Sequence, residues 1–302
     1  MRWVQQTLKK SEFIQRVDTG VWEMTGTKKI QLNSIKEGKK VIAFSTELGI
    51  CIWSRSKAVF ESTIDEDIHL VLTSPPYPLK NPRAYGNVDV NQYIDFLCEI
   101  LEPIVKKLAP GASIALNLSN DIFEPQSPAR SIYLEKLTIA IVERFSLSKM
   151  DTLSWKSNKI PGPTQWASKQ RMQLNTCYEP ILWFCNDPLK CFADNRRVLQ
   201  PHTDKHLKFI SAGGITKKTT HGDGAYQKNI GGYRNPTKGR IPRNILDFSN
   251  YCQSGRNVNK YAKELGLPVH AAKMPLNLAN FLVKFLSRPG DLVCDPFAGT
   301  LT

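Results

Sequence analysis

The chain has 302 residues, of which 41% are hydrophobic and 23% charged, a composition typical of a folded globular protein rather than a disordered or fibrous one. Its formal net charge of +14 favours a polyanionic partner, and nucleic acid is the first candidate. No run approaches the roughly 18 apolar residues of a membrane helix, and the first residues lack the apolar core of a signal peptide.

The seven cysteines are scattered, with no Cys-x-x-Cys pair and no histidine at the spacing of metal ligands. We therefore predict no metal site. Reduced thiols in a cytoplasmic protein are the simplest explanation for an odd number of dispersed cysteines.

The first 45 residues are basic and polar, and we predict that they form an appendage to the main domain. Residues 48–53 are predicted to be a strand and residues 56–63 a short helix. Together with the strand that follows, they would form a βαβ-like unit. That next strand, residues 68–73, is short, aliphatic and apolar, as a buried strand is.

This buried strand ends in Ser74-Pro75-Pro76-Tyr77. The prolines cannot donate to a sheet, and their carbonyls together with the Ser74 hydroxyl are acceptors that could hold an exocyclic amino group by both hydrogens. Tyr77 offers a flat face for stacking. Because open α/β sheets bind ligands at the carboxyl ends of strands, the tetrad predicts a site for an aromatic amine, such as N4 of cytosine or N6 of adenine. The alternative is a plain proline-rich turn.

Helical and strand patterns alternate further along the chain. A polar loop at 81–90 carries Arg83 within reach of a ligand, and Pro110-Gly111 ends the first long helical pattern. The predicted helices are 91–108 and 131–144, and the predicted strands are 113–118, 151–155 and 178–184. This alternation predicts a doubly wound α/β sheet.

Residues 196–243 differ in composition from the rest of the chain. They contain eleven Lys and Arg, two acidic residues and seven glycines, and their apolar residues show no regular periodicity. Such a basic, glycine-rich segment is typical of a surface for phosphate contacts and groove reading. The alternative is a solvated, partly disordered loop. The candidate DNA contacts are Arg83 and, in this segment, Lys217, Lys218, Lys228, Arg234, Lys238, Arg240 and Arg243.

The C-terminal part of the sequence begins with His270 to Pro275, followed by an apolar-faced helix at 276–286. A turn then leads into a strand at 292–295, which ends in Asp295 and a turn of small residues. An acidic residue and a glycine turn after a strand are how many α/β folds begin a cofactor site, because glycine permits close backbone approach.

With Ser-Pro-Pro-Tyr early, the basic segment in the middle and Asp-Pro-Phe-Ala-Gly-Thr late, the chain resembles the beta-class amino-methyltransferases of restriction–modification systems. The resemblance runs from about residue 48 to the last residue and includes the segments 85–87, 128–133 and 270–275. It implies a circularly permuted Rossmann-like methyltransferase fold. It also implies an appendage at 1–45, a catalytic part at 46–195, a target-recognition region at 196–250 and the start of the cofactor-binding part at 251–302.

The resemblance further implies transfer of a methyl group from S-adenosylmethionine to N4 of a cytosine flipped out of duplex DNA, protecting that DNA from a partner restriction enzyme in the bacterial cytoplasm. The implied catalytic residues are Ser74, Pro75, Pro76 and Tyr77. The implied cofactor residues are His270, Pro275, Asp295, Pro296, Phe297, Ala298, Gly299 and Thr300. Adenine-N6 methylation, methylation of RNA and a catalytically incomplete DNA-binding fragment remain alternatives.

Two departures from the family pattern stand out. The family continues past the Gly-Thr turn with elements that complete the cofactor site, whereas this sequence ends at Thr302. We therefore expect a shortened chain, or one completed by a second polypeptide, with weak or no activity from these 302 residues alone. The second departure is Asn117, because some relatives have an acidic residue at the end of the corresponding strand.

Overall fold

The computed structural model describes residues 39–79, 88–156, 163–267, 269 and 273–299, and the backbone alone of residues 14–18 and 21–24. The chain divides into two compact units, residues 1–55 and residues 56–302.

The first unit contains two hairpins, in which β1 (Ile14–Asp18) pairs with β2 (Val21–Met24) and β3 (Val41–Ser45) pairs with β4 (Ile50–Trp53). The predicted strand at 48–53 is confirmed as β4, but the predicted βαβ-like unit is wrong. The Thr46 N–H donates to Gly49 O at 2.8 Å across a tight turn. The chain therefore reverses directly, and β4 pairs with β3 in a sheet of its own.

The second unit is built on a six-stranded mixed sheet in the order β11-β7-β8-β6-β5-β12. Its strands are β5 (Ile68–Thr73), β6 (Leu108–Asn117), β7 (Ser148–Lys156), β8 (Tyr178–Cys185), β11 (Ile245–Asp247) and β12 (Val293–Cys294). β5 pairs in parallel with β6 and β12, whereas β8 runs antiparallel to β6 and β7. The carboxyl ends of β12, β5 and β6 therefore meet the amino end of β8 at one edge of the sheet, which we call the motif edge because Ser74-Pro75-Pro76-Tyr77 begins there.

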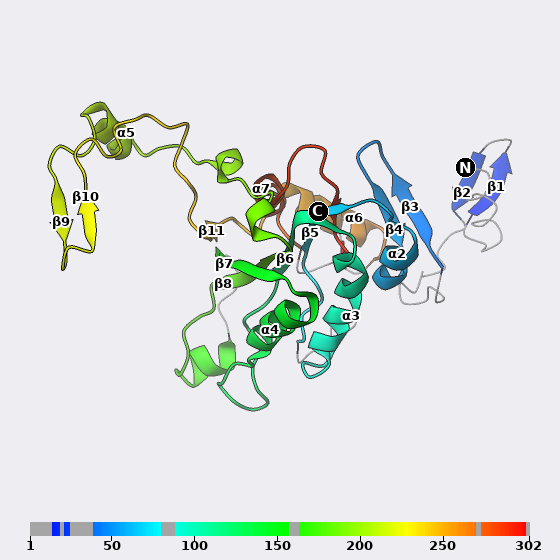
Figure 1. The fold of residues 1–302 in the computed structure, drawn as a ribbon. Coiled ribbons are helices and arrows are strands. Elements are labelled where there is room, and N and C mark those ends of the chain that lie inside the picture. The colour runs from blue at the N-terminus through cyan, green and yellow to red at the C-terminus, as the bar shows by residue number, and fades with distance from the viewer. Residues whose placement is uncertain are drawn as a thin grey trace. The chain divides into compact units, whose positions relative to one another are not determined.

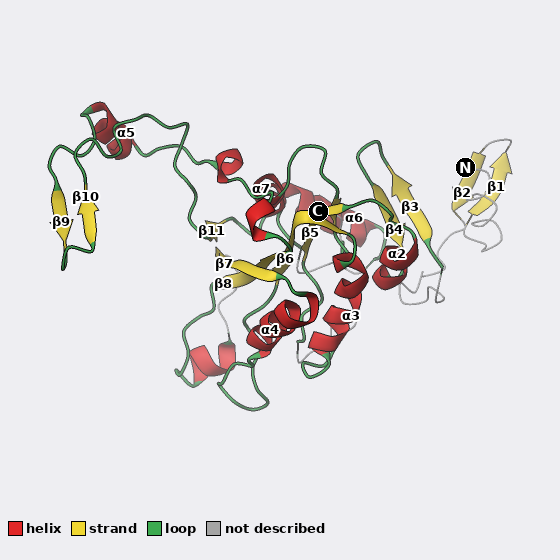
Figure 2. Cartoon of the chain, viewed as in Figure 1, coloured by secondary structure: helices red, strands yellow, loops and turns green. Residues whose placement is uncertain are grey.

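Helices cover both faces of this sheet (Figures 1 and 2). On one face lie α2 (Ser56–Ser62), α3 (Tyr93–Val105) and α4 (Tyr133–Phe145), and on the other lies α7 (Leu276–Leu286). Alternate strand residues feed the two cores: Ile114 and Leu116 pack with the α3 and α4 side chains, and Ala115 packs with those of α7. The predicted α/β fold is confirmed. None of the helices described is long and apolar enough to cross a membrane.

The predicted helices and strands of the sheet domain are present, with several boundaries displaced and the start of β6 displaced most. β6 begins at Leu108, so it runs through Pro110-Gly111, which the sequence indicated as a break. Gly111 has a φ of +91°, and a Cβ on it would lie 2.0 Å from Lys190 O. This glycine therefore permits close approach of the Lys190 backbone rather than ending an element.

The basic segment is more regular than its sequence indicates. It holds α5 (Asp204–Ser211) and the antiparallel ribbon of β9 (Thr219–His221) and β10 (Tyr226–Lys228), and α6 (Gln253–Glu264) follows it. Gln200 and Arg240 exchange backbone hydrogen bonds at 3.0 and 2.9 Å, which closes the base of the segment. Neither α5 nor α6 has a buried residue. Without a core-facing apolar stripe, the two helices gave no clear periodic signal.

Candidate active site

The Ser-Pro-Pro-Tyr motif follows β5 directly, at the motif edge. The Ser74 and Tyr77 hydroxyl oxygens lie 3.2 Å apart. The Tyr77 hydroxyl donates to Glu179 Oε2 at 3.0 Å, and Asn117 Nδ2 donates to the Tyr77 oxygen at 3.2 Å and to Glu179 Oε2 at 3.4 Å. We call these four residues the serine–tyrosine network. It joins three strands that lie side by side in the sheet.

Sheet pairing positions the two members that come from other strands. Asn117 is the last residue of β6 and is in register with Ile181, two residues beyond Glu179 on β8. The Leu118 N–H continues this pairing by donating to Pro180 O at 2.9 Å. Asn117 was noted in the sequence only as a departure from the family pattern, and Glu179 was not predicted. An acidic residue at the start of a buried apolar strand was the signal that could have identified it.

The surroundings of Tyr77 keep its phenol protonated. Burial raises the pKa of Tyr77 well above its usual value, and the negative charge of Glu179 raises it further, while the hydrogen bond with Ser74 acts in the opposite direction. The Tyr77 hydroxyl is therefore a hydrogen-bond donor at neutral pH, which is what its contact with the Glu179 carboxylate requires.

A second group of contacts holds the loop that follows β6. Arg130 donates to Asn120 O, to Asp121 Oδ1 at 3.2 Å and to Thr176 Oγ1 at 2.9 Å, and its guanidinium lies 4.7 Å from the centre of the Phe123 ring. The segment 128–133, which resembles a family block, therefore contains a structural clamp. It fixes the chain on both sides of the serine–tyrosine network, after Asn117 and before Glu179.

The turn after β12 lies beside the motif. Thr73 Oγ1 donates to Asp295 Oδ1 at 2.5 Å, the Phe297 N–H donates to the same oxygen at 2.9 Å, and the Ser56 hydroxyl donates to Pro296 O. Gly299 has a φ of +51°, so the turn closes through a left-handed residue.

Asp295 is exposed to solvent, although neighbouring protein partly desolvates its carboxyl group. This partial removal from water raises the pKa of Asp295, while the hydrogen bonds from Thr73 and Phe297 lower it. An accessible carboxylate beside a glycine turn suits a cationic ligand that must also approach the protein backbone closely. These residues therefore fit the methyl donor that the resemblance implies.

The remaining predicted residues fall in different places. Pro275 is buried, and its carbonyl accepts from the Leu278 and Ala279 N–H groups, so its evident role is to begin α7. His270, Thr300 and Arg83 lie outside the described residues. The other seven predicted DNA contacts lie in the basic segment. Six are exposed and Lys228 is half-buried, and none pairs with a carboxylate in the part of the chain that the structure describes.

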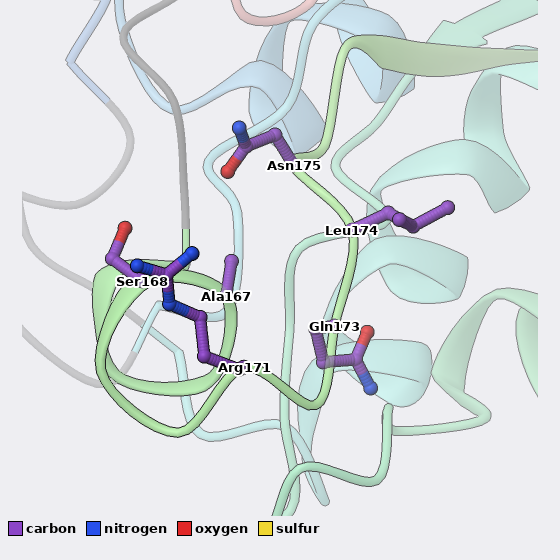
Figure 3. Close-up of a pocket in the computed structure, with 6 residues that line it drawn as sticks. All are labelled: Ala167, Ser168, Arg171, Gln173, Leu174 and Asn175. Atoms are coloured by element: carbon purple, nitrogen blue, oxygen red, sulfur yellow. The ribbon is translucent and has the colours of Figure 1, made fainter.

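A pocket lies in the connection between β7 and β8 (Figure 3). It is lined by Ala167, Ser168, Arg171, Gln173, Leu174 and Asn175. Ser168 belongs to the short helical segment Thr164–Lys169, and Arg171 follows it. Gln173 Nε2 donates to Pro128 O at 2.9 Å. Among the described residues, no predicted catalytic or cofactor residue lines this pocket, and no member of the serine–tyrosine network does.

Comparison with known proteins agrees with this geometry. A DNA methylase family model matches residues 68–302. The chain is 30% identical over 272 residues to the type II methyltransferase M.PvuII of Proteus hauseri, covering 88% of this chain and 78% of that protein. It is 25% identical over 241 residues to M.BglII of Bacillus subtilis, covering 78% of this chain and 55% of that one. The solved PvuII DNA methyltransferase (cytosine-N4-specific) superposes with a TM-score of 0.62 at 25% identity, over 86% of this chain and 77% of that one.

The sheet, with helices on both faces and a polar site at its motif edge, defines a Rossmann-like methyltransferase. The chain belongs to the DNA methylase family: it is a DNA methyltransferase, and S-adenosylmethionine is its cofactor. The resemblance seen in the sequence is thereby confirmed.

Proposed function

We propose that this methyltransferase modifies N4 of cytosine at a specific site in double-stranded DNA. The observation that carries the proposal is the serine–tyrosine network, which places a half-buried hydroxyl acceptor, two prolines and an aromatic ring directly after a central strand. Similarity to a solved cytosine-N4-specific enzyme supports cytosine as the target base.

In this proposal the target base is flipped out of the duplex, because its amino nitrogen cannot be reached within the stack. The Ser74 hydroxyl and the Pro75 carbonyl accept hydrogen bonds from the two amino hydrogens, and the Tyr77 ring stacks on the base. These contacts orient the nitrogen lone pair, so the chain acts mainly through positioning and electrostatics. S-adenosylmethionine supplies the methyl group, and Asp295 with the turn through Gly299 would hold it.

The basic segment is the proposed DNA-binding surface, within a target-recognition region at 196–250. Seven of its basic residues are exposed or half-buried and pair with no carboxylate in the described part of the chain, so they can contact phosphates. The side chains of the β9–β10 ribbon are exposed on both faces, apart from the half-buried Lys228. A two-stranded ribbon by itself has little stability in water. The major groove of B-DNA admits a two-stranded ribbon. We therefore assign base reading to β9 and β10.

Protection of DNA from a partner restriction enzyme remains the proposed biological role, and the bacterial cytoplasm the proposed compartment. Nucleoside analysis tests the chemistry. DNA from bacteria that produce the protein is digested and analysed by mass spectrometry, with DNA from the empty host as the control. The proposal predicts N4-methylcytosine. N6-methyladenine would instead identify adenine as the target, and no modified base despite intact DNA binding would identify a catalytically incomplete chain.

A further inference from the structure

The hydrogen-bond directions in the serine–tyrosine network follow from the chemistry of its members. A carboxylate only accepts and an amide nitrogen only donates. The Tyr77 hydrogen is therefore directed to Glu179 Oε2, 3.0 Å away, and the Tyr77 oxygen accepts from Asn117 Nδ2 at 3.2 Å. Since Tyr77 has no second hydrogen to give, the contact with Ser74 at 3.2 Å must be one in which Ser74 donates.

This order determines what Ser74 offers to a substrate. With its hydrogen directed to Tyr77, the serine oxygen presents only lone pairs to the half-buried space in front of it. Lone pairs are what an amino group needs from its partner. If Ser74 donated instead, it would compete for the nitrogen lone pair that attacks the methyl carbon.

We propose that Glu179 is a positioning residue for methyl transfer: through Tyr77 it holds Ser74 as a hydrogen-bond acceptor, and it receives the proton that the reaction releases. This inference rests on the proposed function. It assigns a role to a residue that contacts Tyr77 and Asn117 and stands 105 positions from Ser74 in the sequence.

The proton balance gives the second half of the role. As the amino nitrogen bonds to the methyl carbon, the carbon–sulfur bond breaks and its electron pair stays on sulfur. The methylated nitrogen then carries one proton too many. That proton passes to Ser74 Oγ as the serine hydrogen passes to Tyr77 and the tyrosine hydrogen passes to Glu179, which ends as the neutral acid. Glu179 is half-buried, so it can return the proton to solvent.

Asn117 completes the arrangement. Its amide donates to both the Tyr77 oxygen and Glu179 Oε2, and thereby holds the carboxylate against the phenol. A carboxylate at position 117 would be a second acceptor and would compete for the Tyr77 hydrogen. The departure from the acidic residue of some relatives is therefore consistent with a network whose acid lies on β8.

The decisive variant is Glu179→Gln, which keeps size and shape but can donate to Tyr77. The Tyr77 hydrogen would then turn to Ser74, and Ser74 would present its hydrogen to the base. On DNA carrying the mapped methylation site, we expect the single-turnover rate to fall about 10²–10⁴-fold, the range of general acid–base effects. The dissociation constants for DNA and cofactor should stay at the wild-type values. The exposed Glu143→Gln on α4 is the matched control.

A double-mutant cycle with Tyr77→Phe separates this role from loss of folding. If Glu179 acts through Tyr77, the double variant is no slower than the slower single variant, because the connection is already broken. Losses that multiply, or a wild-type rate in Glu179→Gln, would overturn the inference. Melting curves and cofactor affinity exclude unfolding as the cause. A wild-type protein that methylates no DNA would instead count against the proposed function, so the two failures are distinguishable.

Discussion

Thr73 donates to the Asp295 carboxylate at 2.5 Å across 222 positions of sequence and thereby joins the end of β5 to the turn after β12. Thr73 is also the residue directly before Ser74. The proposed base-side and cofactor-side groups are therefore held together by one side-chain contact between neighbouring parallel strands. Their relative position is a property of the rigid sheet, as an in-line transfer requires.

Asp295→Asn should weaken binding of S-adenosylmethionine. The cationic methyl donor favours the ionised carboxylate, so affinity is fully present above the pKa of Asp295 and is lost as pH falls through it. Because the pKa of Asp295 is raised by its partial removal from water, this loss should begin at a higher pH than for an ordinary aspartate. Titration calorimetry over a pH series measures the affinity for S-adenosylmethionine. The affinity of the Asp295→Asn variant should not show this loss at low pH.

Asp291→Asn is the control for that experiment. Burial acts to raise the pKa of Asp291, but hydrogen bonds from the Arg288 side chain and backbone, with the charges nearby, outweigh it and lower the pKa. Its ionised form therefore stabilises the fold above the pKa of the unfolded chain, and the contribution is lost as pH falls through the lowered value. The variant should melt at a lower temperature at neutral pH yet keep its cofactor affinity. Equal loss of affinity in both variants would contradict a direct role for Asp295.

Lys217→Ala with Lys218→Ala should weaken DNA binding and make it less sensitive to salt. Each phosphate contact removed lowers the slope of log K against log salt by about 0.9 on duplex DNA. Fluorescence anisotropy between low and moderate salt gives both slopes, and Lys136→Ala on α4 is the control outside the basic segment. An unchanged slope would remove these lysines from the proposed surface.

Gln227→Ala should relax sequence selectivity while leaving the salt slope unchanged. Gln227 is in register with Thr220, so the two side chains share one exposed face of the β9–β10 ribbon. Glutamine makes paired hydrogen bonds to adenine, worth about 1–3 kcal/mol of discrimination, and the threonine methyl suits thymine. Sequencing of methylated positions in host DNA is the measurement. A recognition site that keeps its full stringency would argue against base reading by this face.

Arg197 and Arg196 are neighbours in the basic segment but should behave differently when replaced by alanine. Arg197 donates to the Phe192, Phe285 and Ser287 carbonyls and ties the segment to the end of α7. Its loss should cost about 2–3 kcal/mol of unfolding free energy. Arg196 is exposed and pairs only with Asp194 among the described residues, so its loss should change stability little. Urea unfolding of both variants measures this difference. Equal unfolding midpoints would contradict a stabilising role for the Arg197 contacts.

The sheet domain was predictable because its elements carry apolar faces with clear periods. Strand β5 and helices α3 and α4 were predicted from regularly spaced apolar residues, and these residues pack together in one core. The hairpin partner of β4 was not predictable, since nothing in a short apolar run specifies which sheet it joins. Helices α5 and α6 were not predicted because neither has a buried residue and so neither has an apolar face with a clear period.

The candidate site could be proposed from the sequence only where a compact motif marked it. Ser74 to Tyr77 and Asp295 to Gly299 each follow a strand and are local in sequence. Glu179 is not: its importance arises from the antiparallel placement of β8 beside β6, which brings its carboxylate to Tyr77. Similarly, the segment 128–133 was noted for its resemblance to a family block, but the contacts of Arg130 were not predictable because they depend on a loop that folds back toward Thr176.

Ser74→Ala tests the central claim most directly, with methyl transfer and DNA binding measured on the same protein. Removing one hydroxyl deletes the acceptor that holds the target amine but leaves the DNA-binding surface intact. We predict a single-turnover rate lower by at least about 10²-fold, with an unchanged dissociation constant for DNA. Equal loss of rate and binding, or a rate close to that of the wild type, would contradict the account.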